Sequence, residues 1–187
     1  MKDSLNRLWR WVRWPLAVLV VAYAVLVVYR TGYFFEKDRV DADVAGIHAQ
    51  RLVLADVEGA HLPPDPSVQE NNATLAGVDV NQNGIRDDVE RAIFKKYPTD
   101  KKSRAAALQY AKALQMEFTQ VYNSETLVAV IQEEDRGFIC LGEDRKREEI
   151  KDLVFDTEVR RNWRENIREQ YGKSYKLSNI QECDILF

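Results

Sequence analysis

The sequence predicts a mainly α-helical protein, in which an N-terminal transmembrane helix precedes a small helical ectodomain. Two observations predict this fold class. An uncharged apolar run lies near the start of the chain, as a membrane-spanning helix requires. Beyond residue 86, apolar residues recur at spacings of three and four, which is the pattern of amphipathic helices.

The apolar run covers residues 14–29 and follows a basic segment, residues 1–13, that contains one Lys and three Arg. A spanning helix needs about 20 residues, so we extend the span to 14–35, with Arg30 snorkelling to the far interface. Trp and Tyr side chains lie near both ends, where amphipathic rings favour lipid headgroups. Because Lys and Arg mark the cytoplasmic side, we expect residues 1–13 inside and the C-terminal domain in the bacterial periplasm.

A cleaved signal peptide is the alternative, because Ala22-Tyr23-Ala24 matches the small-x-small rule for cleavage sites. Cleavage there would leave an apolar N-terminus beginning at Val25, so the uncleaved anchor is favoured. Both interpretations export the chain, either as a single-pass protein of the bacterial inner membrane or as a secreted protein.

The rest of the chain divides into a stalk with a Pro-rich linker, residues 36–66, and a helical ectodomain, residues 67–187. The stalk is expected to stay helical as far as residue 50, and residues 52–57 are expected to form a short extended piece. Each proline restricts the residue before it, so residues 61–66 cannot be helical. Residues 67–76 are polar and are expected to form a loop.

Residues 79–90 read Asp-Val-Asn-Gln-Asn-Gly-Ile-Arg-Asp-Asp-Val-Glu. A hard cation such as Ca²⁺ takes six to eight oxygen ligands from a loop that turns sharply, and this spacing supplies them. The expected ligands are the side chains of Asp79, Asn81, Asn83, Asp87 and Glu90 and the backbone carbonyl of Ile85. The two asparagines leave three negative charges, which favours weak binding, roughly 10⁻⁴–10⁻³ M, and a structural ion.

The loop resembles those of EF-hand-like proteins, and more closely the short DxNxNGxxDxxE loops of dockerins and thrombospondin type 3 repeats. The resemblance covers the loop alone. It departs from the paired EF-hand at position 8, where Arg86 replaces the aliphatic residue that bridges to a second loop. No second copy exists and Gly77 lies where an entering helix would end, so we expect an unpaired loop with only an exiting helix. The wider run from Leu62 to Pro98 also looks like a group of exported bacterial proteins of unknown function.

A metal-free interpretation of the loop stays open. Asp87 and Glu90 are three residues apart and form a capping-box-like start for a helix over Val89, Ile93 and Phe94. The helix dipole would favour these acidic residues without an ion. Capping alone does not require three oxygen-bearing side chains at alternate positions before the glycine, so calcium is favoured.

Cys140 and Cys183 are the two cysteines of the chain. Exported thiols oxidise, so we expect a disulfide that ties the C-terminal tail to the helical body. Such a bridge would contribute roughly 4 kcal/mol of stability in the chain-entropy model. Two buried free thiols are the alternative.

The expected helices after the loop run from Val89 to Phe94, 101–122, Ser124 to Leu141, Ile150 to Val154 and Val159 to Tyr171. Tyr97-Pro98 should end the first of these helices and Gly172 the last. The last helix carries apolar residues at every fourth position (Val159, Trp163, Ile167 and Tyr171), which predicts a core seam rather than a ligand site. Its arginines alternate with glutamates, which predicts a solvated face whose charges pair with one another.

Acidic residues outnumber basic ones beyond the anchor, which argues against nucleic acid as a partner. The two histidines do not lie at metal-ligand spacing, and no SxxK, GxSxG or HExxH motif occurs. We therefore expect a non-enzymatic, calcium-stabilised envelope protein that serves as a structural or protein-interaction module. A calcium-responsive switch and an enzyme of unrecognised class are the alternatives.

Overall fold

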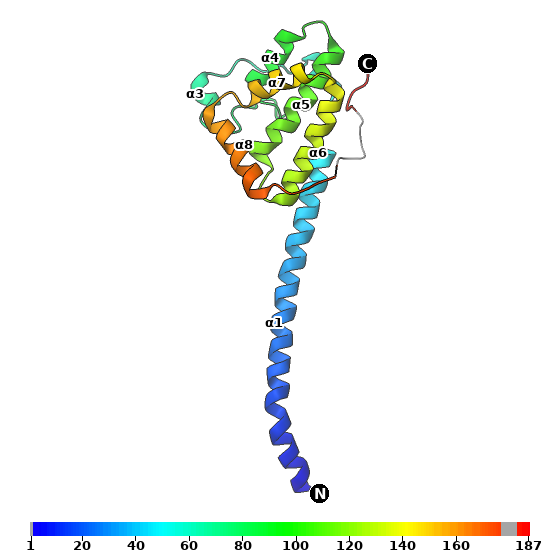
Figure 1. Ribbon diagram of the computed structural model, residues 1–187, viewed down its shortest axis with the longest axis vertical. Helices are drawn as coiled ribbons and strands as arrows, with labels where there is room; N and C mark the ends of the chain where they lie inside the picture. Colours follow the sequence, from blue (N-terminus) through cyan, green and yellow to red (C-terminus); the bar gives the residue numbers. More distant parts are fainter. Residues whose placement is uncertain (1, 177–182) are drawn as a thin grey trace. The chain divides into compact units, whose positions relative to one another are not determined.

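A computed structural model describes residues 2–176 and 183–187 of the chain (Figure 1). The fold is mainly α-helical, as the sequence predicts: within the described residues there are eight helices and no strand. The chain forms two compact units, Met1–Ala42 and Asp43–Phe187.

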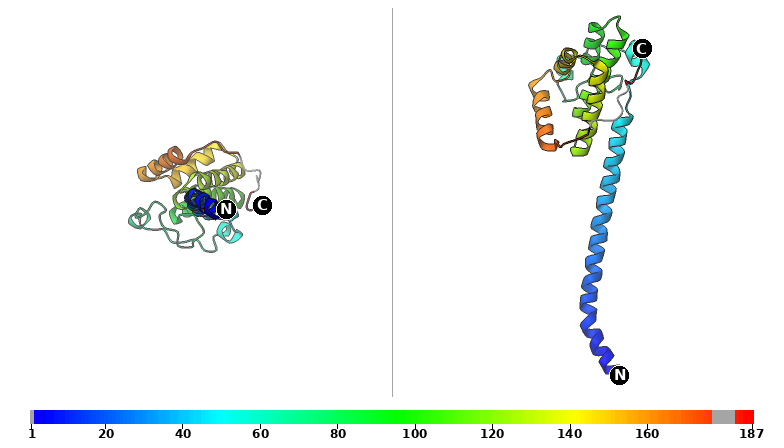
Figure 2. Two further views of the ribbon diagram at one scale, coloured as in Figure 1. Left: turned by 90° about the horizontal axis from the view of Figure 1, so that it is seen from below. Right: turned by 45° about the vertical axis from the view of Figure 1, so that its right-hand side comes forward.

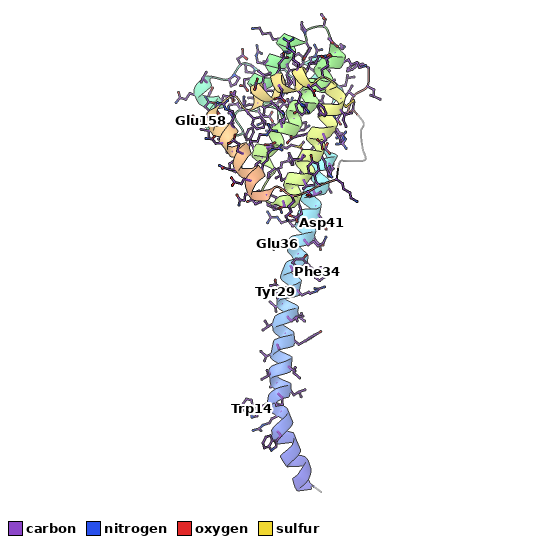
Figure 3. The ribbon with its side chains drawn as sticks, viewed as in Figure 1. Trp14, Tyr29, Phe34, Glu36, Asp41 and Glu158 are labelled. Carbon is purple, nitrogen blue, oxygen red and sulfur yellow. A yellow bond between two sulfur atoms is a disulfide. The ribbon has the colours of Figure 1, made fainter. Side chains whose placement is uncertain are left out.

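The first unit consists of most of α1, a helix that covers Lys2–Ala49 and continues into the second unit. From Arg13 onwards the helix is long and apolar enough to cross a membrane, and its apolar stretch is not buried in protein. Trp14 and Tyr29 lie at different levels of α1 (Figure 3), and the side chains between them are exposed and mostly aliphatic. The guanidinium of Arg30 lies 5.2 Å from the ring of Phe34. A membrane anchor or a signal sequence has these properties.

The second unit is a bundle of helices around α5, Lys101–Thr119 (Figures 1 and 2). The helices that pack directly against α5 are α2 (Leu54–Glu58), α4 (Asp87–Lys96), α6 (Ser124–Leu141) and α7 (Asp144–Val154). α8, Glu158–Tyr171, packs against α6. A single turn, α3 (Val68–Asn71), lies in the long connection between α2 and α4.

The α5 helix occupies the centre because its many alanines let neighbouring helices approach closely. Ala107 and Ala111 are fully buried. Gly137 of α6 comes so near that a Cβ atom on it would lie 2.8 Å from the Cα of Tyr110. A larger side chain at position 137 would therefore separate α6 from α5.

The core also includes the segment that carries the predicted loop. Val89 and Ile93 of α4 and Ile85 of the loop are buried in the same cluster as Leu108 and Val154. The exiting helix predicted from the sequence is therefore confirmed, and its apolar face fixes the loop on the core. The last turns of α1 contribute Ile47 to a smaller cluster with Met116 and Val130.

Two short elements differ from the expectation. Residues 54–58 form a helix rather than an extended piece, because the Asp56 carboxylate accepts a hydrogen bond from the Val53 amide and Val57 is buried in the core. The segment predicted as a loop contains α3, whose N-terminus is stabilised by a reciprocal capping box between Ser67 and Glu70. Local side-chain capping decided both cases.

The last helix differs from the expected core seam. Gly172 ends α8 as predicted, and Ile167 is buried, but Val159 is 67% exposed. Trp163 and Tyr171 are only half-buried. Because α8 packs mainly against α6, the ends of its apolar stripe open to solvent.

The predicted disulfide between Cys140 and Cys183 is confirmed, with the two Cα atoms 5.5 Å apart. It holds the tail where the carboxylate of Asp184 accepts hydrogen bonds from the Leu52 amide and from Arg136, each at 2.9 Å. The tail is therefore connected both to α6 and to the segment that follows α1. A disulfide at this place indicates an oxidising compartment.

Candidate metal-binding loop

The first half of the loop is a tight turn organised by the carboxylate of Asp79. This carboxylate accepts hydrogen bonds from the backbone amides of Asn83 (3.2 Å) and Gly84 (2.9 Å). Gln82 and Gly84 adopt φ angles of 56° and 85°, in the left-handed region that reverses the chain. The glycine at position 6 of the loop therefore has the conformational role expected from the sequence.

The two asparagine side chains converge on Glu90. Nδ2 of Asn81 donates to one oxygen of the Glu90 carboxylate at 3.0 Å, and Nδ2 of Asn83 donates to the other at 3.1 Å. Glu90 lies in α4 and is 1% exposed. Side chains from both ends of the loop therefore meet around one buried carboxylate.

Asp87 lies beside this group and is fully buried. Its Oδ1 accepts a hydrogen bond from the Val80 amide at 3.1 Å, whereas its Oδ2 has no hydrogen-bond partner among the described residues. Burial raises the pKa of Asp87, and the nearby charge of Asp79 raises it further. A buried carboxylate oxygen without a donor is costly, and a cation is one means of compensating it.

The metal-free capping box is not formed. The N-cap of α4 is Arg86, and no side chain makes the capping hydrogen bond there. Asp87 is the first residue of the helix, and its carboxylate contacts Val80 rather than the amide of Glu90. The capping box predicted between Asp87 and Glu90 is therefore absent, whereas both residues lie in the first turn of α4, where the helix dipole favours acidic side chains without an ion.

Burial also dominates the electrostatics of Glu90. It raises the pKa of Glu90 to about 7, and the charges of Asp56 and Asp87 add to this effect. The two asparagine amides act in the opposite direction, because they donate to the ionised form. The loop thus holds a carboxylate whose charge is poorly compensated by protein groups alone.

Ile85 contributes to the loop through its backbone and its side chain. Its amide donates to Oδ1 of Asn83 at 2.9 Å, and its side chain is fully buried in the core. The side chain of Lys112 covers the loop at Gly84, where an added Cβ would lie 3.3 Å from its Cε. The role of the Ile85 carbonyl as a ligand stays a prediction.

Arg86 makes contacts that the sequence does not predict. It is fully buried, and its guanidinium donates to the carbonyls of Leu153 and Val154 at the end of α7. It also forms ion pairs with Asp88 and Asp156. The residue that departs from the EF-hand pattern therefore attaches the loop to α7. Its unusual identity at position 8 was the available signal.

Arg160 holds the segment that precedes the loop. It is 1% exposed and donates to the carbonyls of Leu75 (2.9 Å) and Asn71 (2.6 Å), while it also pairs with Asp156 at 2.7 Å. The expectation of a solvated, self-paired arginine face on α8 is wrong at this position. It is also wrong for Arg164 and Arg168, which pair with the buried Glu117 and Glu134 rather than with glutamates of α8. Alternation of Arg and Glu in the sequence gave no sign of these contacts.

The structure does not bring the three predicted carboxylate ligands of the loop together as a metal-binding group. Among the described residues, no group of three or more His, Cys, Asp or Glu side chains is placed to hold a metal ion. The predicted set contains three carboxylates, Asp79, Asp87 and Glu90, and its other two side chains are asparagines. Calcium binding by the loop stays a prediction, and it would require the amide oxygens of Asn81 and Asn83. Such oxygens suit a hard cation such as Ca²⁺ and not a softer metal that prefers His or Cys.

A cation would also change how the two asparagines are oriented. Their Nδ2 groups face Glu90, so half-turns of the amides would present their oxygens instead. Each half-turn would also give up a backbone hydrogen bond, because Oδ1 of Asn83 accepts from the Ile85 amide at 2.9 Å and Oδ1 of Asn81 accepts from the Asn83 amide at 3.3 Å.

The chain has no significant match among protein-family models, curated proteins or solved structures. The function of the protein must therefore be inferred from its own residues, and those of the loop are the starting point.

Proposed function

We propose that the protein is a membrane-anchored module of the bacterial envelope whose periplasmic unit is stabilised by one calcium ion. In this proposal α1 is an uncleaved anchor with its basic N-terminus in the cytoplasm. The unit Asp43–Phe187 acts as a structural or protein-interaction element rather than as an enzyme. The apolar stretch of α1 and the disulfide support the location.

The convergence of loop side chains on Glu90 carries the calcium proposal. Asn81 and Asn83 reach Glu90 from the turn. Asp87 adds a buried oxygen that lacks a donor among the described residues. The side chains of Asp79, Asn81, Asn83, Asp87 and Glu90, with the carbonyl of Ile85, are the proposed ligands. A bound Ca²⁺ would neutralise carboxylates that burial otherwise destabilises.

A thermal melt of the full chain tests this proposal. In phospholipid nanodiscs, millimolar calcium should raise the midpoint relative to excess EDTA. At a calcium concentration 100 times the dissociation constant, the folded state gains about 2.7 kcal/mol. For a unit of this size that corresponds to a rise of about 5–10 °C.

Glu90→Gln is the informative variant. Glutamine keeps the size of the side chain and one acceptor oxygen for the asparagine amides but removes the charge, so calcium should no longer raise the midpoint. Because burial of the Glu90 charge is unfavourable, the variant should fold at least as well as the wild type in EDTA. Glu165→Gln, an exposed position on α8, is the matched control and should respond to calcium like the wild type.

Each possible result of this experiment has a different meaning for the proposal. An unchanged wild-type midpoint refutes calcium binding. Equal shifts in the wild type and in Glu90→Gln place the ion elsewhere in the protein. A calcium-dependent change in hydrogen exchange far from the loop would favour a switch over a structural ion.

A further inference from the structure

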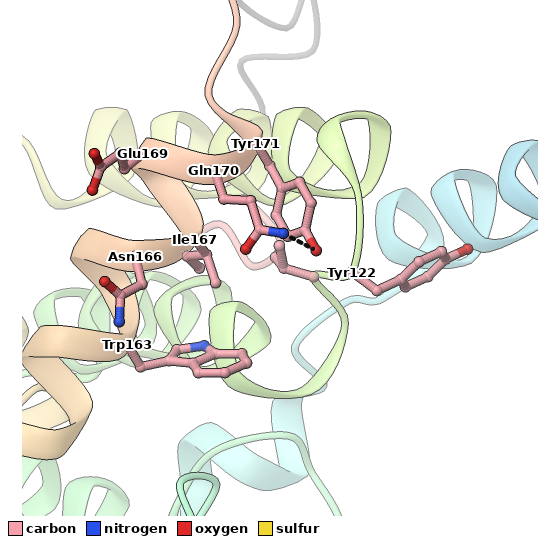
Figure 4. Close-up of a pocket in the computed structure, with 8 residues that line it drawn as sticks. Tyr122, Trp163, Asn166, Ile167, Glu169, Gln170 and Tyr171 are labelled. Carbon is pink, nitrogen blue, oxygen red and sulfur yellow. Dashed lines mark hydrogen bonds between the residues drawn. The ribbon is translucent and has the colours of Figure 1, made fainter.

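A surface groove of about 640 Å³ lies between α8 and the connection from α5 to α6 (Figure 4). Its wall on α8 consists of Trp163, Ile167 and Tyr171, which lie on one helix face because they are four residues apart. Val121 and Tyr122 form the other side. The volume lies within the range of small-ligand sites in proteins, roughly 300–1,000 Å³.

Hydrogen bonds fix the orientation of the rings. The indole Nε1 of Trp163 donates to the Glu117 carbonyl at 3.1 Å, and the Tyr122 hydroxyl donates to Asp43 at 2.5 Å. The Tyr171 hydroxyl accepts from Nε2 of Gln170 at 3.1 Å (Figure 4). The rings of Trp163 and Tyr122 are therefore held in place before any ligand arrives, which lowers the entropic cost of binding.

A cluster of two partly exposed arginines and two buried glutamates supports the wall from behind. Arg168 bonds to the carboxylates of Glu117 and Glu134, and Arg164 lies 3.2 Å from Glu117. Glu117 is fully buried and also holds Trp163 through its carbonyl. This network connects α8 to α5 and α6, so the groove is a built feature rather than a gap between loosely packed helices.

The open polar groups of the groove are mostly neutral. Asn166 and Gln170 supply amides, which both donate and accept hydrogen bonds, although one N–H of Gln170 already donates to Tyr171. Glu169 supplies the one carboxylate among the lining residues. Sugars combine apolar C–H faces, which pack on aromatic rings, with hydroxyl and acetamido groups that both donate and accept. From this match we propose that the groove binds a neutral oligosaccharide, such as an N-acetylated glycan of the cell envelope.

A proline-rich peptide fits the same groove less well. Such peptides dock on aromatic rings whose polar tips donate to the peptide carbonyls. Here the indole N–H of Trp163 and the hydroxyl of Tyr122 already have acceptors within the protein, which leaves the hydroxyl of Tyr171 as the one ring donor for a peptide. The inference rests on the exported location given under the proposed function, but it does not require calcium.

The test uses the full chain in phospholipid nanodiscs, because glycoside detergents would compete for the groove. Replacing Trp9, Trp11 and Trp14 by Phe leaves Trp163 as the one tryptophan of the chain. Its fluorescence is then titrated with the tetramer of β-1,4-linked N-acetylglucosamine and with cellotetraose. We expect a saturable change with at least one of these sugars, and the same change in EDTA and in calcium.

Two variants and a control examine the site. Tyr171→Ala should weaken binding about tenfold, because it removes a stacking surface. Asn166→Ala should weaken it about fivefold, because it removes a hydrogen-bonding side chain. Asn162→Ala, one helical turn away on α8 and outside the groove, should leave binding unchanged.

The inference is overturned if neither sugar gives a saturable change, or if Tyr171→Ala binds as well as the wild type. A change produced by a proline-rich peptide and by neither sugar would reassign the groove to a peptide. If calcium still raises the melting midpoint in these samples, the failure concerns the groove alone and not the proposed function.

Discussion

Removing the guanidinium of Arg86 tests how an unpaired loop is held in place. Arg86→Met keeps the buried stem but removes the donors to Asp88 and to the carbonyls of Leu153 and Val154. It also removes the ion pair with Asp156 at 3.1 Å. Hydrogen bonds from a charged donor contribute about 1.5–3 kcal/mol each. The two aspartates are about one-third exposed, so water offsets part of the loss. We expect a destabilisation of about 3–4 kcal/mol.

The assay is chemical and thermal unfolding of the full chain, followed by Trp163 fluorescence in the background without other tryptophans. The expected loss corresponds to a fall in the melting midpoint of about 10 °C. Arg91→Met is the matched control, because Arg91 also joins an aspartate and a carbonyl but is itself 36% exposed, and its partner Asp65 is 72% exposed. The control substitution should lower the free energy of unfolding by less than about 1 kcal/mol. If both variants lose the same stability, Arg86 does not attach the loop to α7 in the way described.

Two further predictions concern the buried glutamates and the N-terminus. Burial and the adjacent carboxylate of Glu117 raise the pKa of Glu134 well above 4.5. As the pH rises from about 4.5 towards the folded pKa, Glu134 ionises in the unfolded state but keeps its proton in the folded state, so the stability of the protein falls. The stability of Glu134→Gln relative to the wild type should increase from pH 4 to pH 7.5, as measured by denaturant midpoints. A difference that does not change with pH would contradict this prediction. Separately, mass spectrometry of the protein from membranes should find the anchor intact, and an N-terminus at Val25 would show that it is a cleaved signal.

Much of the fold could be predicted because its signals are local. The apolar run of α1, the spacing in α4 to α8 and Gly172 as a helix stop depend on neighbouring residues alone. The disulfide followed from two cysteines and an exported chain. The turn of the loop was also predictable, because the glycine at position 84 permits a left-handed φ angle.

The charges could not be placed, because burial is decided by distant parts of the chain. Arg160 and Glu117 look like ordinary surface residues in the sequence, and the unusual place of Arg86 in the loop pattern does not reveal its partners, yet all three residues are buried. Their partners lie up to 89 residues away along the chain, as in the bond from Arg160 to the Asn71 carbonyl. Hydrophobic periodicity predicts which face of a helix turns inward, but it does not predict which charged residue will be buried on that face.

These buried arginines bear on whether an ion in the loop would act as a switch. In a paired EF-hand the second loop supports the first, and here Arg86 and Arg160 take over that support through the shared carboxylate of Asp156. Gly77 has a φ angle of 71°, and a Cβ there would lie 2.3 Å from the stem of Arg86, so the entering chain packs directly on that arginine. Both flanks of the loop are thus fixed by protein contacts that involve no proposed ligand. An ion could then reorient the asparagine amides and neutralise buried carboxylates, while the helices on either side keep their positions. This arrangement favours a structural ion over a regulatory one.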